Sequence, residues 1–401
     1  MKDDRIIIAG GGPIGYTLAA SLERYGIPFV LLEAGDRIFD DPRAGTIHPP
    51  SLELFRDLQL SNALLRRGNI VKSYQYHDRK QGVVAEFDLT ILADETDFPY
   101  RLMLEQHKVC EIVHEHLNSK QPHAIRRQHR VISVSQDDTG VAAEVETPAG
   151  KKTIRGRYIV GCDGGRSQVR KSMNVDFDGF QYPERFLVLS TPYDFSAAGY
   201  ASTNYIADPD EWCALFKVPG KQKTGMWRVV FPTETQQTEE ELFDEAAVQR
   251  RIQRFHQKDG SYDIAHRNLY AVHQRVASCY RDGRMLIAGD AAHINNPLGG
   301  MGMNFGFHDV FNLSEKLNRI WNEGAEEALF DQYDRQRRTV ASEYLQRQTI
   351  ENKKNIEQQD PEVRKQFYDE LRGIAKDPVK QKAYLMRAAM IEGFRYAESI
   401  K

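Results

Sequence analysis

The chain has 401 residues, of which 41% are hydrophobic and 28% are charged, and its net charge is −3 at pH 7. A single hydrophobic core stops growing at roughly 250–300 residues, so we expect two interlocked domains. The near-neutral charge argues against nucleic acid or a membrane surface as a partner. No apolar run approaches the ~20 residues that span a bilayer, and we expect no signal peptide and a cytoplasmic location.

Metal binding and disulfide bonding find no support in the sequence. The four cysteines are widely spaced and form no CxxC pair, unlike a zinc knuckle or a disulfide framework. His114 and His116 stand close together, but residues at this offset do not share a helix face. We therefore predict no metal site.

The segment from Arg5 to Glu33 predicts a βαβ unit that binds an adenine dinucleotide. An apolar run leads into a Gly-x-Gly-x-x-Gly turn and a helix, and a second apolar run ends at Glu33. Gly10 allows the tight turn, Gly12 lets the backbone approach a pyrophosphate, and Gly15 lets the helix lie close to the strand. The helix N-terminus attracts the phosphates, and Glu33 suits the ribose of FAD or NAD better than that of NADP. The alternative is a Gly-rich turn in a ligand-free α/β domain.

The next elements alternate between helices and strands. Helices are predicted over residues 51–58 and 104–117, and a hairpin over 131–145 with its turn at 137–140. Residues 158–162 form a continuous apolar run, which is typical of a buried parallel strand.

The second half of the chain changes character at about residue 180. Alternating aromatic and β-branched residues up to 232 predict a largely antiparallel sheet, and residues 239–257 predict a helix. A parallel strand returns at 285–290, and beyond 309 nearly all of the chain is predicted helical. One late helix opens at Asp360 and Pro361, and another, over 384–391, is apolar around much of its circumference. We expect this last helix to pack against the dinucleotide-binding domain or a second subunit.

Two further segments carry a recognisable pattern. In each, a buried strand is followed by an acid and small residues, namely Asp163 with Gly164 and Asp290 with the Gly-rich stretch 297–304. Together with the N-terminal unit, in this order and spacing, they resemble the fingerprints of the aromatic-ring flavoprotein monooxygenases. These are the 4-hydroxybenzoate hydroxylase-like, single-component FAD-dependent hydroxylases, and the resemblance covers the whole chain.

The resemblance implies an α/β fold in which a Rossmann-like FAD-binding domain is interlocked with an antiparallel-sheet substrate domain and followed by a helical C-terminus. We expect the FAD-binding domain to comprise residues 1–75, 101–175 and 276–330. The substrate domain would comprise an insertion at 76–100 and the main sheet at 176–275, with the helical region at 331–401.

The same resemblance implies a set of FAD-binding residues. Arg43 would meet the pyrophosphate, Gln106 the ribityl chain or flavin, Asp163 both flavin and passing NAD(P)H, and Asp290 the ribityl hydroxyls. Backbone N–H groups of the 299–304 loop would stabilise the reduced flavin near N1 and C2=O. The full expected set is Gly10, Gly12, Pro13, Ile14, Gly15, Glu33, Ala34, Arg43, Gln106, Val131, Asp163, Gly289, Asp290, Pro297, Gly300, Gly302, Met303 and Asn304. Asp163 can instead close a turn, and His293 is expected to be a packed or capping residue.

The chain has one dinucleotide fingerprint, so the resemblance implies that NADH or NADPH binds only transiently. Oxygen would add at flavin C4a, and the resulting hydroperoxide would hydroxylate a small phenolic or hydroxylated heteroaromatic compound. A group that removes or shares the phenol proton is useful because a phenolate attacks better than a phenol.

Catalytic candidates are Tyr205, whose segment can be laid over the family's Tyr-x-x-x-Pro, Pro297 through its carbonyl, and His48. Tyr205 is otherwise a core tyrosine, and His48 lies either at the pocket mouth or at the cap of the following helix. Further candidates for the substrate site are Trp212, Phe216 and Arg228. Phe216 stands where the hydroxybenzoate enzyme has a serine of its carboxylate clamp, so hydroxybenzoate itself is not expected.

Two rival interpretations stay open. The same fold serves flavin-dependent reductases and dehydrogenases, although the Trp-x-Trp-x-Ile-Pro segment of halogenases is absent. A flavin-binding regulatory protein without turnover is the second rival. A homodimer is suggested by analogy alone, and neither the substrate nor the preferred nicotinamide follows from the sequence.

Overall fold

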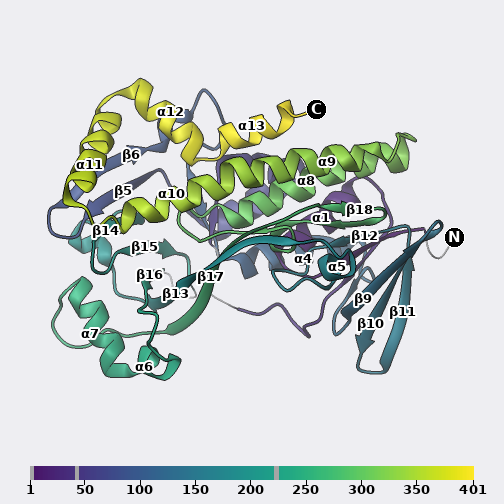
Figure 1. The fold of residues 1–401 in the computed structure, drawn as a ribbon, viewed down its shortest axis with the longest axis horizontal. Helices are drawn as coiled ribbons and strands as arrows, with labels where there is room; N and C mark the ends of the chain where they lie inside the picture. The colour runs from purple at the N-terminus through teal and green to yellow at the C-terminus, as the bar shows by residue number, and fades with distance from the viewer. Residues whose placement is uncertain (1–3, 41–44, 221–224) are drawn as a thin grey trace.

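The computed structural model describes residues 4–40, 45–220 and 225–401. Its first large element is a six-stranded sheet in the order β18-β19-β12-β1-β2-β8, in which all strands but β18 run parallel (Figure 1). The strands are β1 (Ile6–Ala9), β2 (Phe29–Leu32), β8 (Ile125–Arg126), β12 (Tyr158–Gly161), β18 (Arg281–Asp282) and β19 (Met285–Ile287). Helices α1 (Pro13–Arg24), α4 (Gln106–Lys120) and α8 (Gly302–Asn322) pack together beside it. The predicted βαβ unit and the buried parallel strand are confirmed.

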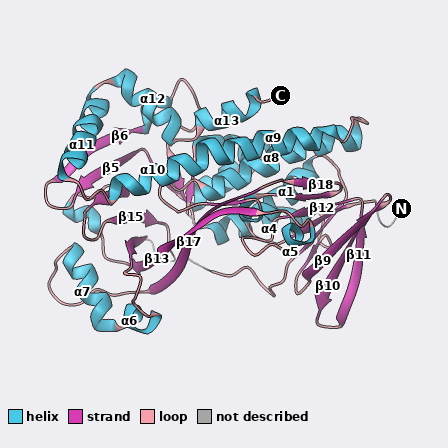
Figure 2. Ribbon diagram, viewed as in Figure 1, coloured by secondary structure: helices cyan, strands magenta, loops and turns pink. Residues whose placement is uncertain are grey.

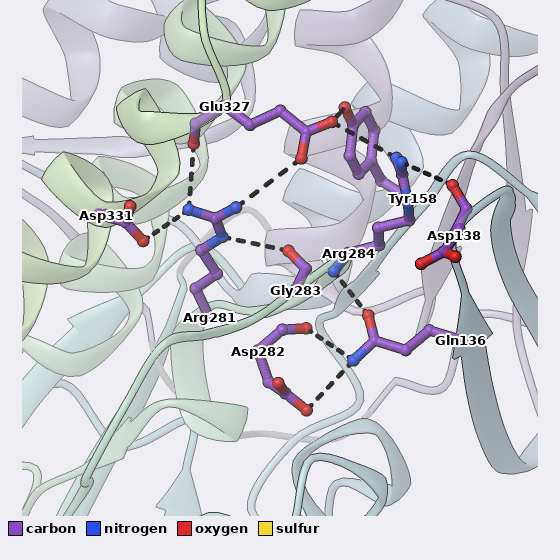
Figure 3. Close-up of polar contacts among 9 residues, drawn as sticks. All are labelled: Gln136, Asp138, Tyr158, Arg281, Asp282, Gly283, Arg284, Glu327 and Asp331. Carbon is purple, nitrogen blue, oxygen red and sulfur yellow. Dashed lines mark hydrogen bonds and ion pairs between the residues drawn. The ribbon is translucent and has the colours of Figure 1, made fainter.

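The predicted hairpin belongs to a separate three-stranded sheet of β9 (Arg130–Asp137), β10 (Gly140–Thr147) and β11 (Gly150–Gly156). Its turn forms as predicted, because the Asp137 carboxylate accepts hydrogen bonds from the Thr139 and Gly140 N–H groups. Figure 3 shows how polar contacts tie this sheet to the Rossmann-like domain. The Arg284 N–H donates to the Gln136 side chain at 2.7 Å, and the Arg284 guanidinium contacts Glu327.

The second large element is an eight-stranded sheet in the order β20-β17-β13-β16-β15-β14-β5-β6. It is antiparallel except where β14 runs parallel to β5. The strands are β5 (Ser73–Asp78), β6 (Gly82–Asp88), β13 (Phe177–Thr191), β14 (Thr203–Ala207), β15 (Cys213–Val218), β16 (Met226–Pro232), β17 (His266–Ala277) and β20 (His293–Ile294). The predicted antiparallel sheet is therefore confirmed, whereas the numbered domain boundaries stay predictions.

One face of this sheet is covered by two short helices, α6 (Glu239–Phe243) and α7 (Glu245–Phe255), where one helix had been predicted over 239–257. The break lies at Asp244, which leaves the helical conformation and caps α7 by accepting a hydrogen bond from the Ala247 N–H. A local capping interaction thus overrides a helical pattern that is continuous in the sequence.

The C-terminal region is helical, as predicted. Figure 2 shows α9 (Ala328–Val340), α10 (Arg347–Ile356), α11 (Pro361–Lys376), α12 (Pro378–Ala388) and α13 (Ile391–Ser399) along one side of the molecule. The start of α11 is as expected, with Asp360 as N-cap and Pro361 at the first helical position. Among the described helices, none is both long and apolar enough to cross a bilayer.

The expectation for the helix over 384–391 needs correction. It ends at Ala388, and Met390 adopts a left-handed conformation with φ of 68° before α13 begins. Leu385 and Ile391 join the apolar core of the eight-stranded sheet, which includes Phe87. The segment therefore packs on the substrate sheet through these two residues, which was not predicted. Met390 instead joins a cluster with Met301 and Phe305 at the start of α8, so the expected packing against the flavin domain is confirmed for this residue.

Candidate active site

A cavity of about 800 Å³ runs between the six-stranded and the eight-stranded sheets. This volume lies within the range of small-molecule sites, roughly 300–1,000 Å³. One end is lined by the Gly-rich turn and the other by the face of the eight-stranded sheet. The predicted cofactor residues that line it are Gly10, Gly12, Pro13, Ile14, Glu33, Ala34, Gln106, Val131, Asp163, Asp290, Pro297, Gly300, Gly302 and Met303. Arg43 lies outside the described residues.

The Gly-rich turn has the geometry of a phosphate cradle. Gly10 has φ of +101°, and a Cβ there would come within 2.4 Å of the Cys162 carbonyl oxygen. A Cβ on Gly15 would lie 1.9 Å from the Gly10 carbonyl oxygen, so Gly15 serves close packing of α1 and does not line the cavity. At Gly12, the N-cap of α1, a Cβ would meet nothing within 4 Å. The open space over the helix N-terminus fits a pyrophosphate.

Two carboxylates flank this cradle. Glu33 is held by backbone N–H groups, since its side chain accepts from Gly11 and from Gly35, each at 2.6 Å. Asp163 accepts from the Gln168 N–H at 2.7 Å, while its other oxygen, Oδ1, is buried with no hydrogen-bond partner among the described residues. Burial raises the pKa of Asp163, and the hydrogen bonds to its carboxylate only partly offset this. An unpartnered buried acceptor beside the cavity is what a site for ligand hydroxyl or amide groups requires.

Two residues expected to bind the cofactor are turned away from the cavity. The Gly289 N–H donates to Asp309 Oδ2 at 3.0 Å, and a Cβ there would come within 2.9 Å of the Ile14 side chain. The Asn304 side chain accepts from the His48 N–H at 2.8 Å and donates to the Thr46 carbonyl at 2.9 Å. Asn304 therefore ties the start of α8 to the segment before α2, because α8 packs against β3 (Thr46–Ile47) and α2 (Pro49–Asp57).

Of the two positions expected for His48, the structure supports the N-cap of the following helix, α2. Its ring is fully buried and does not line the cavity, and although it is the N-cap of α2 its side chain makes no capping bond. Nε2 lies 3.0 Å from the Gly299 carbonyl, which can only accept, so Nε2 carries the proton. Burial and the Arg101 charge lower the pKa of His48 to about 3, against the raising effect of the Gly299 bond. A neutral, enclosed imidazole supports the Gly299 loop and is poorly placed for proton transfer.

The substrate candidates divide into two groups. Phe216 and Arg228 line the cavity from β15 and β16, together with Val188 and Val230. Tyr205 does not line it, and its ring packs edge-on against Phe216, which does.

Trp212 is also outside the cavity wall. It is buried in the sheet core and packs edge-on against Phe186, with ring centroids 5.0 Å apart. Its place in the loop before β15 turns the indole toward the sheet interior. Both corrections arise from tertiary packing that the sequence pattern does not show.

Strand β17 provides a polar part of the cavity wall that was not predicted from the sequence. Asn268, Tyr270 and His273 line the cavity. Burial raises the pKa of Tyr270, and the nearby charge of Arg228 acts in the opposite direction. Residues 268–276 include Tyr270, Val272 and Val276, which favour a strand, and this was the available signal for β17.

A buried ionic cluster supports the flavin loop from the far side. Asp309 of α8 accepts from His293 Nε2 and from Arg337 Nε, each at 2.7 Å, and all three side chains are at most 1% exposed. Burial alone would raise the pKa of Asp309, but the charges and hydrogen bonds of His293 and Arg337 lower it to about 2. His293 is thus a packed residue, as expected, and it fastens β20 to α8.

Comparison with known proteins agrees with this geometry. The model of the FAD binding domain family matches residues 3–348. Para-nitrophenol 4-monooxygenase of a Pseudomonas species is 32% identical over 402 residues, covering 98% of both chains. A 6-hydroxy-3-succinoylpyridine 3-monooxygenase of Pseudomonas putida is 28% identical, covering 93% of this chain and 94% of that protein.

Among solved structures, the crystal structure of p-nitrophenol 4-monooxygenase from Pseudomonas putida superposes with a TM-score of 0.92 at 31% identity, covering 98% of each chain. A fit of this extent includes both sheets and the C-terminal helices. The chain therefore belongs to the FAD binding domain family and, within it, to the FAD-dependent aromatic monooxygenases.

Proposed function

We propose that this enzyme hydroxylates a small phenolic or hydroxylated heteroaromatic compound, using FAD, NADH or NADPH, and O2. The observation that carries the proposal is that one continuous cavity joins the phosphate cradle at Gly12 to the wall that carries Phe216, Arg228 and Tyr270. Relatives named as monooxygenases of para-nitrophenol and of a hydroxypyridine support the substrate class. Bound FAD supplies the acceptor for hydride and the chemistry that activates oxygen.

The residues of the chain bind and orient the reactants. The N-terminus of α1 holds the pyrophosphate, Glu33 the ribose, and Asp163 and Asp290 the remaining polar groups of the cofactor. The N–H groups of Gly302 and Met303 at the start of α8 would favour negative charge on a flavin bound in the cavity. Each of these proposed contacts is assigned to residues that line the cavity.

The aromatic substrate lies against Val188, Phe216 and Val230, which exclude water from the reacting face. Arg228 holds an anionic oxygen of the substrate, either the phenolate or a ring substituent, since a guanidinium offers planar paired donors. Tyr270 donates a hydrogen bond to a substrate oxygen, and its raised pKa keeps this hydroxyl protonated.

The test is NADH and NADPH oxidation with oxygen uptake, measured on FAD-loaded protein across a panel of phenols and hydroxypyridines that includes p-nitrophenol. We expect at least one compound to stimulate oxidation of the nicotinamide together with uptake of oxygen. Stimulated oxidation without oxygen uptake would identify a reductase of the same fold. Failure of every compound, with fully loaded FAD, would favour a non-catalytic flavoprotein.

A further inference from the structure

The segment between β20 and α8 presents alternate residues to the cavity. Asn295 and Pro297 line it, whereas Asn296 between them is completely buried on the other side. An extended chain has this two-residue alternation. The residues that face away from the cavity therefore determine where the Pro297 carbonyl and its neighbours lie.

Two side chains and one backbone carbonyl of the helix over residues 346–352 hold this outer side of the segment. Gln346 donates to the Ile294 carbonyl at 3.1 Å, and Asn352 donates to the Leu298 carbonyl at 3.1 Å. Between them, the Thr349 carbonyl accepts from the Asn296 side chain at 2.9 Å. Positions 346, 349 and 352 are spaced three apart on the helix. They bond to residues 294, 296 and 298, which are spaced two apart on the extended segment.

Gln274 of β17 completes the network. Its Oε1 accepts from the Asn296 N–H at 3.0 Å, and its Nε2 donates to Thr349 Oγ1 at 2.7 Å. The Thr349 hydroxyl in turn donates to the Leu345 carbonyl at 2.8 Å. Gln274, Asn296 and Thr349 are each at most 2% exposed. The Thr349 hydroxyl thus fixes the amide that holds the backbone next to Pro297.

The helix is locally adapted to make these contacts. Between α9 and α10 the chain forms a π-helical turn, Ala341–Gln346, within one continuous rod (Figure 1). The wider turn leaves the Gln346 carbonyl able to accept from Gln274 Nε2 at 3.3 Å and from the Thr349 hydroxyl at 3.2 Å. Single π-turns inside α-helices often occur at functional sites.

We propose that Thr349, acting through Gln274 and Asn296, is a positioning residue that sets the Pro297 segment against the flavin and the substrate. This inference rests on the proposed function. In coupled turnover one oxygen atom of O2 enters the aromatic product and the other becomes water. In uncoupled turnover both atoms leave as hydrogen peroxide, and either route consumes one NAD(P)H and one proton. A displaced segment shifts turnover toward peroxide.

The test compares Thr349→Val, which keeps the shape and removes the hydroxyl, with Thr349→Ser, which keeps the hydroxyl. Ser314→Ala is the matched control, since Ser314 is similarly buried and, among the described residues, its hydroxyl bonds only to the Phe311 carbonyl of its own helix. Each FAD-loaded variant is assayed with p-nitrophenol for aromatic product and hydrogen peroxide per nicotinamide oxidised. The visible circular dichroism of bound FAD reports the ring environment without turnover.

We expect Thr349→Val to lower the product formed per nicotinamide at least about threefold and to change the flavin dichroism. Thr349→Ser and Ser314→Ala should match the wild type in both measurements, even where their thermal stability falls. The inference is overturned if Thr349→Val matches the wild type, or if Thr349→Ser shows the same defect as Thr349→Val. If the wild type forms no product with any compound, the proposed function fails, and the dichroism of the same variants still decides the role of Thr349.

Discussion

The ring of Phe216 lies edge-on against the ring of Tyr205, with 6.0 Å between their centroids and an angle of 81° between their planes. Phe216 lines the cavity and Tyr205 does not. On this side the cavity therefore ends at an apolar ring, and the tyrosine belongs to the cluster behind it with Tyr74.

The two rings should respond differently to mutation. Tyr205→Phe removes a hydroxyl of a residue that does not line the cavity, so we expect kcat to change less than about threefold. Phe216→Ala removes a wall of the site and should raise KM about tenfold to a hundredfold, the equivalent of one buried aromatic side chain. Steady-state kinetics with the same phenol measures both. A large fall in kcat for Tyr205→Phe would return this tyrosine to the catalytic group.

Gly12→Asp should abolish FAD retention while leaving the fold intact. A side chain at Gly12 meets no protein atom within 4 Å, but it occupies the approach of the pyrophosphate and brings a like charge. The flavin-to-protein ratio of purified protein and its thermal unfolding measure the two effects.

The matched variant is Gly15→Ala, whose Cβ would come within 1.9 Å of the Gly10 carbonyl oxygen. It should destabilise the fold by about 1–3 kcal/mol through forced backbone movement. A yellow Gly12→Asp protein at wild-type stoichiometry would show that the cradle is not the phosphate site.

Arg228→Gln should weaken binding of the phenol that stimulates turnover more than it slows chemistry. Loss of a hydrogen bond to a charged group is worth about 1.5–3 kcal/mol, so KM should rise about tenfold to a hundredfold. Arg267→Gln is the control, because Arg267 bonds to the Phe243 carbonyl on the opposite side of the same sheet. Equal KM values for the two variants would remove Arg228 from the substrate site.

Asp309→Asn should destabilise the protein by about 3–5 kcal/mol at pH 7, because it leaves Arg337 buried beside a neutral group. The folded-state pKa of Asp309 is lowered to about 2 from an ordinary value of 3.8. The contribution of the Asp309 carboxylate to the free energy of unfolding is therefore complete above about pH 4 and is lost as the pH falls toward 2.

Urea unfolding at several pH values measures this dependence. The stability difference between wild type and Asp309→Asn should stay constant from pH 7 to about pH 4 and then narrow by about 2 kcal/mol as the carboxylate is protonated. A difference that narrows already between pH 7 and 5 would mean that another group dominates the cluster.

The cofactor end of the site was predictable from sequence because its signals are local. Gly10, Gly12 and Glu33 are read from one turn and two adjacent strands, and the parallel strand at 158–161 from an unbroken apolar run. Asp163 also lines the cavity, because the carboxyl ends of parallel strands meet at one edge of the sheet.

The substrate end was less predictable because it depends on packing between distant segments. The cavity is lined by Phe216 of the neighbouring strand and not by Tyr205. Tyr270 of β17 also lines it, although no sequence motif marks this residue. The link from Asp309 to Arg337 joins two helices, and the π-helical turn has no recognisable sequence signal. Propensity and periodicity describe one element at a time, whereas these features come from the contact of several.

The most direct test of the proposed hydroxylation is turnover of the FAD-loaded protein under oxygen gas enriched in oxygen-18. The compounds offered are p-nitrophenol and the other phenols of the panel. Mass spectrometry of the aromatic product then reports the source of the new oxygen atom. The account predicts a product that carries one heavy oxygen atom from the gas and consumption of one NAD(P)H for each coupled turnover. A product that carries no heavy oxygen, or a substrate changed only by added hydrogen, would contradict it.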